Sequence, residues 1–188
     1  TLGYLGHMWE LYAMWTWIAA FAVASLEAAG SPDPSQGGSL VAFAAIASGT
    51  AGCVLAGYLG DRVGKAHVAA TAMAVSAICC LLSPLAFGAP AALLVALVTV
   101  WGFAVVADSA QFSALVAEYS DQHYVGTALT VQVCLGFLLT TVTIRLTPEI
   151  AAAYGWKWAF LFLAPGPAAG IWALRPLLSG SSRRPGRQ

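Results

Sequence analysis

Long runs without a single charged residue constrain this chain more than any other feature. Residues 40–56 and 68–82 contain no Asp, Glu, Lys or Arg. Charged residues make up only 9% of the 188 residues, whereas a soluble domain carries about 25%. So few polar groups cannot cover the surface of a water-exposed fold. The sequence therefore predicts a protein that crosses a lipid bilayer several times.

Six segments are long and apolar enough to span the bilayer core, which takes about 20 residues. The connections between them are short, and no ten-residue alternation of the barrel type appears, so we expect packed antiparallel helices. The expected fold class is an all-α integral membrane protein, a six-transmembrane-helix bundle. The expected spans are residues 2–28, 39–59, 66–87, 91–118, 125–146 and 156–178, followed by a basic tail at 179–188. Pro165, Gly166 and Pro167 predict a kink inside the last span.

The basic residues predict the orientation of the bundle. With six spans, both ends of the chain lie on the same side as the second–third and fourth–fifth connections. That side collects six of the eight basic residues, namely Arg62, Lys65, Arg175, Arg183, Arg184 and Arg187. The other side has only Arg145 and Lys157. By the positive-inside rule we expect a multi-pass protein of the plasma (inner) membrane with a cytoplasmic C-terminus.

A compact charged motif lies between the second and third spans. It reads GYLGDRVGK, and its key residues are Gly57, Gly60, Asp61, Arg62, Gly64 and Lys65. This stretch resembles the G-x-L-[AG]-D-R-x-G-[RK] loop of major facilitator superfamily transporters. Residues 155–174 are similar to the last helix of that family. Residues 117–129 are similar to its Glu…Arg-Gly-Thr-Ala segment, in which Glu118 matches but Val125 replaces the arginine.

The resemblance covers essentially the whole chain and places it as helices seven to twelve, half of a fold built from two inverted three-helix repeats. It implies a secondary active transporter, proton-linked and moving a small solute by alternating access, without a cofactor. The expected partners are the lipid bilayer, an unidentified small-molecule substrate, and either the missing N-terminal six-helix half or a second copy of the chain. A non-transporting membrane scaffold or sensor derived from a half-transporter is the alternative.

The charged motif also has a physical interpretation of its own. Gly60 and Gly64 allow a tight turn, and Asp61 can accept hydrogen bonds at a helix N-terminus. Arg62 and Lys65 can pair with acids or lipid phosphates at the cytoplasmic face. In the family this loop acts as a latch that holds the cytoplasmic side closed, and Glu118 is the partner we expect. The alternative is a basic loop that only sets topology.

Two acids are expected inside the membrane, where each charge costs at least ~2.5–3.5 kcal/mol on insertion scales. Glu10 and Asp108 each lie about 14–16 Å from the cytoplasmic end of their span, at 1.5 Å per residue. The spacing of His7 and Glu10 lets their side chains touch, which suits either a proton-coupling pair or a structural one. The expected substrate or proton cavity consists of His7, Glu10, Met14, Trp17, Asp108, Gln111 and Gln132. For Gln132 an interhelical hydrogen bond is the alternative.

Other functional classes lack the residues that they need. The three histidines lie in separate segments, and neither a metal-binding motif nor a Gly-rich nucleotide loop appears, so we expect no metal site and no enzyme. The four cysteines lie inside apolar segments and suggest packing. The net charge of zero argues against a nucleic-acid partner.

Overall fold

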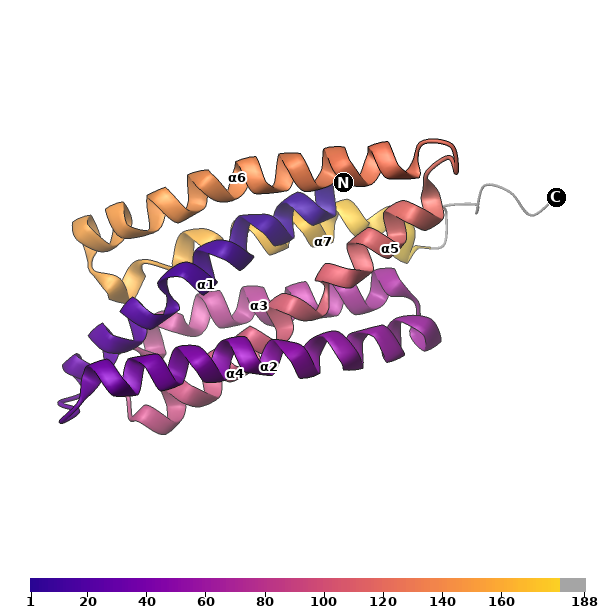
Figure 1. The fold of residues 1–188 in the computed structure, drawn as a ribbon. Helices are drawn as coiled ribbons and strands as arrows, with labels where there is room; N and C mark the ends of the chain where they lie inside the picture. The colour runs from indigo at the N-terminus through magenta and orange to yellow at the C-terminus, as the bar shows by residue number, and fades with distance from the viewer. Residues whose placement is uncertain (180–188) are drawn as a thin grey trace.

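The computed structural model describes residues 1–179, which form a six-span helical bundle (Figure 1). No strand occurs within these residues, so the all-α prediction is confirmed. The long helices are α1 (Leu2–Ala28), α2 (Pro34–Val63), α3 (Lys65–Ala86), α4 (Ala91–Ala107), α5 (Ser109–Tyr119), α6 (Val125–Tyr154) and α7 (Pro165–Leu178). The predicted tail at 179–188 lies outside the described residues, apart from Ser179.

Two of the six spans are broken. The fourth span consists of α4 and α5, which are separated at Asp108. The sixth begins with two short 3₁₀ turns, η1 (Trp156–Trp158) and η2 (Leu161–Leu163), before α7 starts at Pro165. The proline lacks an N–H and fits the first turn of a helix. The break therefore comes just before the Pro-Gly-Pro sequence, and the helix continues through it.

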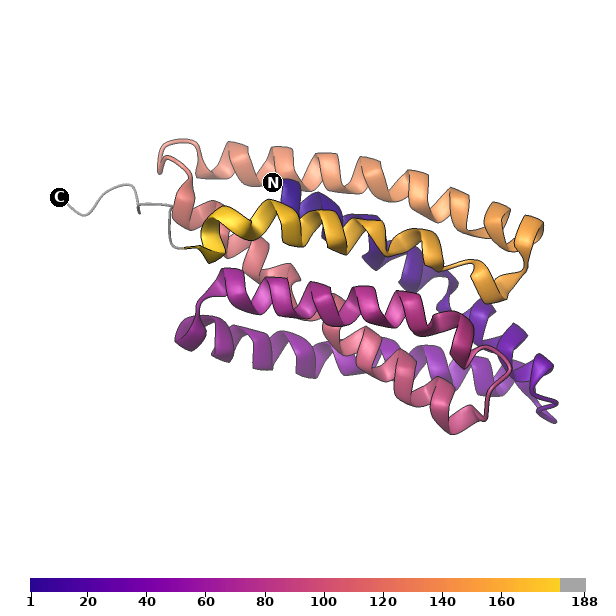
Figure 2. The same ribbon diagram turned by 180° about the vertical axis from the view of Figure 1, so that it is seen from behind.

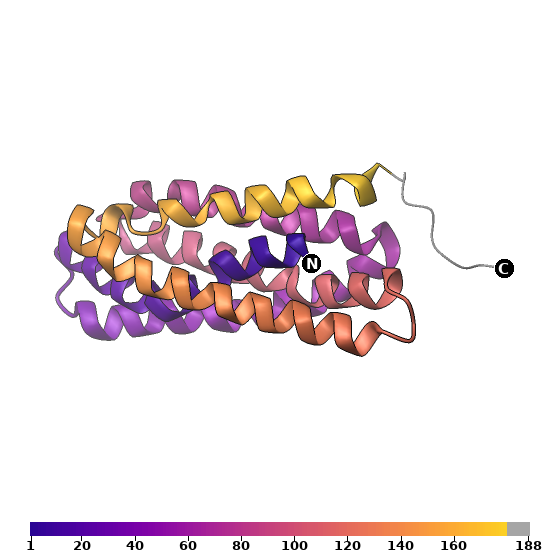
Figure 3. The same ribbon diagram turned by 90° about the horizontal axis from the view of Figure 1, so that it is seen from above.

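The first helix, α1, lies in the interior of the bundle. It packs on α2, α6 and α7, and the view from above shows it between α6 and α7 (Figure 3). From behind, α7 runs beside α3 (Figure 2). The Trp9 indole N–H donates to the carbonyl of Phe162 at 3.1 Å, in the broken part of the sixth span. This hydrogen bond therefore joins α1 to the backbone of η2, where the sixth span is not a regular α-helix.

Small residues bring α2 and α4 into backbone contact. A Cβ on Gly102 would collide with the backbone of Ala45, and one on Gly52 would collide with the backbone of Phe103. Ser48 adds a hydrogen bond from its hydroxyl to the carbonyl of Thr99 at 2.9 Å. Lipid provides no hydrophobic drive for helix association, so such close packing holds the two helices together.

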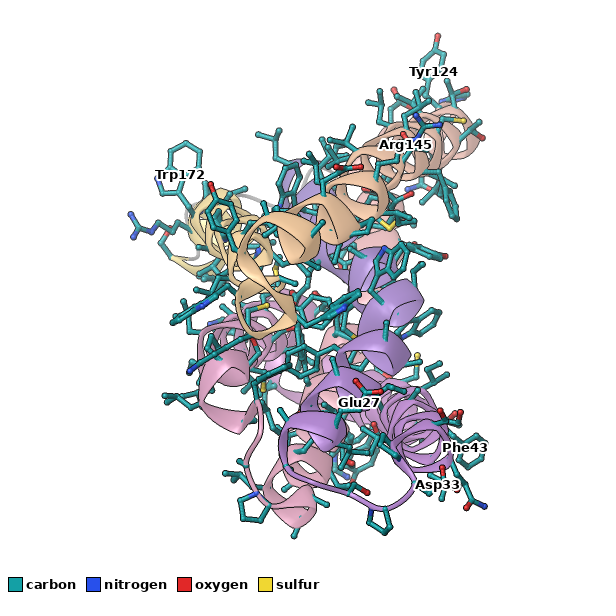
Figure 4. All side chains as sticks on the ribbon, turned by 90° about the vertical axis from the view of Figure 1, so that its left-hand side faces the viewer. Glu27, Asp33, Phe43, Tyr124, Arg145 and Trp172 are labelled. Atoms are coloured by element: carbon teal, nitrogen blue, oxygen red, sulfur yellow. The ribbon has the colours of Figure 1, made fainter. Side chains whose placement is uncertain are left out.

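The outward faces of the bundle are apolar. Phe43, Trp172 and Tyr124 project away from the core in the view down the helices (Figure 4). Glu27 and Asp33 lie at one end of the bundle, beside the connection between α1 and α2. The Asp33 carboxylate accepts the N–H of Gln36 at 3.1 Å and caps α2. Large apolar side chains thus cover much of the outer surface, as in a bilayer-embedded bundle.

Candidate functional site

Glu10 lies inside the bundle, where α1 meets α3 and α4, and it is 1% exposed. One of its carboxylate oxygens, Oε1, accepts hydrogen bonds from Ser76 Oγ and Trp101 Nε1, each at 2.5 Å. The Sγ of Cys80 lies 3.1 Å from the same oxygen. Three donors from two other helices therefore surround one carboxylate oxygen in a buried site.

Asp108 is the second buried acid and lies at the break between α4 and α5. The Nδ1 of His7 lies 2.8 Å from its Oδ1, and both side chains are almost fully buried. The two atoms are close, but their angles fall outside those of a hydrogen bond, and the contact is an ion pair only when the imidazole is protonated. The His7 ring also packs against the rings of Tyr4 and Phe112, with centroids 5.8 and 5.9 Å away.

The predicted contact between His7 and Glu10 is wrong. Their spacing of three does put both on one side of α1, but their side chains turn to different neighbours. The carboxylate of Glu10 turns to the donors on α3 and α4, and the imidazole of His7 turns to Asp108. The two acids therefore have separate partners within the bundle.

Three other residues of the predicted cavity lie between helices, two of them buried and Trp17 partly buried. Met14 is completely buried in the apolar core. The indole of Trp17 donates to the carbonyl of Ile144 at 2.8 Å and joins α1 to α6. Gln111 donates to the carbonyl of Ala56 at 3.0 Å and joins α5 to α2. These side chains hold helices together in this lobe, a role that the sequence alone did not separate from cavity lining.

Gln132 differs from them, because its amide has no hydrogen-bond partner within the described residues. It is fully buried on α6 and borders an open pocket of about 430 Å³ that Thr1 and Leu177 also line. Phe112, Tyr119 and Leu174 contribute to the same pocket. The interhelical hydrogen bond considered for Gln132 is therefore absent from the described part of the chain.

The glycines of the charged motif have separate roles. Gly64 has a φ of +97° and forms the turn between α2 and α3, a conformation that favours glycine. Gly60 was predicted to share this turn, but α2 continues to Val63, so Gly60 is helical. Its missing side chain lets Gln111 lie against the helix, since a Cβ there would lie 2.5 Å from the amide oxygen. Gly57 faces open space.

The charged side chains of the motif surround an open pocket of about 420 Å³. Lys65 Nζ lies 3.3 Å from Glu118 Oε2, and each side chain is about one third exposed, at 31% and 32%. The expected partner of the motif is thus in contact with it. Arg62 lies over the ring of Tyr58 at 4.2 Å. Asp61 is exposed in the last turn of α2 and makes no hydrogen bond or ion pair within residues 1–179.

Sequence reasoning missed the residues around Glu10. Ser76 and Cys80 are spaced by four and share a face of α3, while Trp101 occupies the middle of an apolar run. A lone serine or tryptophan in a membrane helix carries no signal of its own. The shared face of Ser76 and Cys80 becomes informative only once it is known to pack against the helix that carries Glu10. Within residues 1–179, no group of three His, Cys, Asp or Glu side chains could hold a metal ion.

Comparison with known proteins gives one family. Residues 4–188 match the family described as Major Facilitator Superfamily. No curated protein and no solved structure matches the chain significantly.

Proposed function

Since this chain belongs to the major facilitator superfamily, a family of membrane transporters, we propose that it moves a small solute by alternating access and that transport is linked to protons. In this proposal the six spans form one lobe, helices seven to twelve of a twelve-helix carrier. Proton linkage is the more specific part of the proposal, and its support comes from the buried acids Glu10 and Asp108.

The observation that carries proton linkage is the pair of buried carboxylates. Glu10 and Asp108 lie in different spans and are 1% and 2% exposed. An ionisable residue at this depth is expensive, and such residues mark proton or ion pathways. Asp108 also lies where the helix is interrupted, and interrupted helices at membrane depth are a feature of transporter binding sites.

The cytoplasmic motif supports the alternating-access part. Lys65 on α3 and Glu118 at the end of α5 connect two spans at the membrane surface. A contact of this kind is worth about 0–1 kcal/mol, so it can break and re-form during transport. We propose that it acts as a latch on the cytoplasmic side.

A second lobe is proposed to complete the transport path. Helix α6 packs mainly on α1 and is exposed along most of its length, and it lies at the edge of the bundle (Figure 1). The missing six-helix half, or a second copy of this chain, would cover one side of it. The basic residues support an inner-membrane location with the cytoplasmic side at the turn between α2 and α3.

The test uses the full-length protein in liposomes that contain the pH-reporting dye pyranine. The liposomes are diluted into a panel of sugars, amino acids, organic acids and cationic dyes, and lumenal pH is followed. We expect one class of solute to drive proton movement, and Glu10→Gln to abolish it. The control is Glu27→Gln, which neutralises an exposed glutamate at the end of the same helix.

Two outcomes would contradict the proposal. Transport by the unaltered protein that ignores an imposed pH gradient would remove proton linkage. If the Glu10→Gln variant retained transport driven by a pH gradient, Glu10 would have no role in proton linkage. Membership of the family would stand in either case.

A further inference from the structure

The carboxylate of Glu10 is bound on one oxygen by three side chains that the proposed function does not use. Ser76 and Trp101 make the two short bonds, and the thiol of Cys80 makes the third. We propose that Ser76 and Trp101 are positioning residues that stabilise the ionised form of Glu10 in the membrane interior and so set how readily it takes up a proton. This inference rests on the proposed proton linkage at Glu10.

Burial makes these donors decisive. Glu10, Ser76, Cys80 and Trp101 are each 0 or 1% exposed, so bulk water cannot replace a donor that is lost. The indole of Trp101 is fixed in turn, because its ring packs edge-on against Phe160 with centroids 5.2 Å apart. A hydrogen bond to a charged acceptor is roughly twice as strong as one between neutral groups. The donors therefore favour the carboxylate over the carboxylic acid.

Other titratable groups near Glu10 come from three helices. His7 lies one turn away on α1 and is paired with Asp108. Cys79 and Cys80 are on α3, and Asp108 follows α4. Asp108 is the other carboxyl near Glu10. No ion pair joins Glu10 to a cation within residues 1–179. Neutral donors therefore take the place of a cationic partner.

The two strong donors differ in what they can do after protonation. An indole N–H can only donate, whereas a hydroxyl can donate or accept. A proton that binds the carboxylate forms an O–H group, which needs an acceptor in a dry site. The Ser76 oxygen can accept it if the hydroxyl hydrogen turns to the carbonyl of Ala72, one helical turn earlier, as helix serines do. Ser76 can thus serve both states of Glu10, and Trp101 stabilises the ionised one.

The test is a pH titration of the full-length protein by difference infrared spectroscopy, which reads the C=O stretch of protonated carboxyl groups without a substrate. Glu10→Gln identifies the band of Glu10. Ser76→Ala and Trp101→Phe each remove one donor and keep most of the packing. At a fixed pH we expect the ratio of protonated to ionised Glu10 to rise about tenfold to a hundredfold, because a bond to a charged group is lost.

Two further variants keep the experiment specific. Ser76→Thr retains the hydroxyl and should return the ratio to that of the unaltered protein. Ser83→Ala removes a buried hydroxyl on the same helix, one that bonds to the carbonyl of Cys80 at 2.8 Å, and should leave the ratio unchanged. Circular dichroism establishes that each variant retains its helices.

An unchanged ratio in folded Ser76→Ala and Trp101→Phe would overturn the inference, and so would an equal rise in Ser83→Ala. These outcomes differ from failure of the proposed function. Glu10 could show the predicted dependence on its donors in a protein whose transport ignores pH. In that case only the transport assay would fail.

Discussion

Glu10 and Asp108 are buried to the same extent in one lobe, but their surroundings differ in kind. Glu10 lies on the unbroken helix α1, and neutral donors from α3 and α4 bind its carboxylate. Asp108 lies at a break in the backbone, and its partner His7 is itself titratable. A change in the charge of Glu10 therefore need only reorient hydroxyl and thiol groups. A change at Asp108 alters its contact with His7, which links the break to α1.

The break makes the second acid mechanically important. The Asp108 carbonyl accepts the N–H groups of Gln111 and Phe112 at 3.0 and 3.2 Å, so α5 restarts at this residue. The far end of α5 carries Glu118, which contacts Lys65. The His7–Asp108 contact inside the bundle and the Lys65–Glu118 contact at its surface thus lie at the two ends of one eleven-residue helix. Protonation of Glu10 therefore depends on its neutral donors, whereas Asp108 fixes where α5 begins.

The largest expected effect comes from removing His7. His7→Leu leaves the Asp108 carboxyl buried without its partner, and breaking a buried pair costs about 3–5 kcal/mol of unfolding free energy. The double variant His7→Leu/Asp108→Asn should recover most of that loss, because no unpaired charge remains. Thermal unfolding in detergent measures all three proteins. His67→Leu is the control, since His67 is exposed at the surface turn.

A different result would remove the contrast between the two acids. If the double variant were as unstable as the sum of its single variants, His7 and Asp108 would not act as a pair. If His7→Leu changed the infrared band of Glu10 as much as that of Asp108, both acids would share one site.

Much of the lobe could be predicted from the sequence because hydrophobic length and charge placement depend on local residues. Six apolar runs indicated the spans, and the glycines and charges of residues 57–65 indicated a surface turn. The resemblance to the family indicated Glu118 as the partner of that turn. The acids at Glu10 and Asp108 could be recognised as interior because each lies within an apolar run. These inferences need no knowledge of how one helix is rotated against another.

The partners of the acids could not be predicted, because they depend on that rotation. Close contacts set it: a Cβ on Gly6 would collide with the backbone of Gly166, and Gly102 lies against Ala45. With α1 held in this orientation, Glu10 faces Ser76 and Trp101. Spacing along one helix gave the wrong partner for His7 because side chains three residues apart can still diverge to different neighbours.

A smaller effect is expected at the surface end of α5. Lys65 and Glu118 are each about one third exposed, so a double-mutant cycle with Lys65→Ala and Glu118→Ala should give a coupling energy of about 0.2–1 kcal/mol. Thermal unfolding at low and high salt measures it, and the coupling should shrink as salt screens the charges. A coupling as large as that of His7 and Asp108, or one insensitive to salt, would contradict a latch that opens during transport.

The smallest effect concerns an acid in water, Asp121, in the connection between α5 and α6. Its carboxylate accepts the backbone N–H of His123 at 2.9 Å and lies 3.1 Å from the ring Nδ1. The backbone bond, followed by the ring, lowers the pKa of Asp121 below its ordinary value. A lowered folded-state pKa means that the stabilising contribution to the turn is present above the ordinary carboxyl range and is lost as pH falls through the lowered pKa.

An NMR titration of the Asp121 carboxyl carbon should therefore show a midpoint below that of an unperturbed aspartate. His123→Ala should move it back only in part, because the backbone donor, the larger cause, remains. A complete return to the ordinary value would assign the effect to the imidazole alone. Asp121 would then depend on a titratable neighbour as Asp108 does, instead of resembling Glu10, whose strongest contacts are with donors that do not titrate.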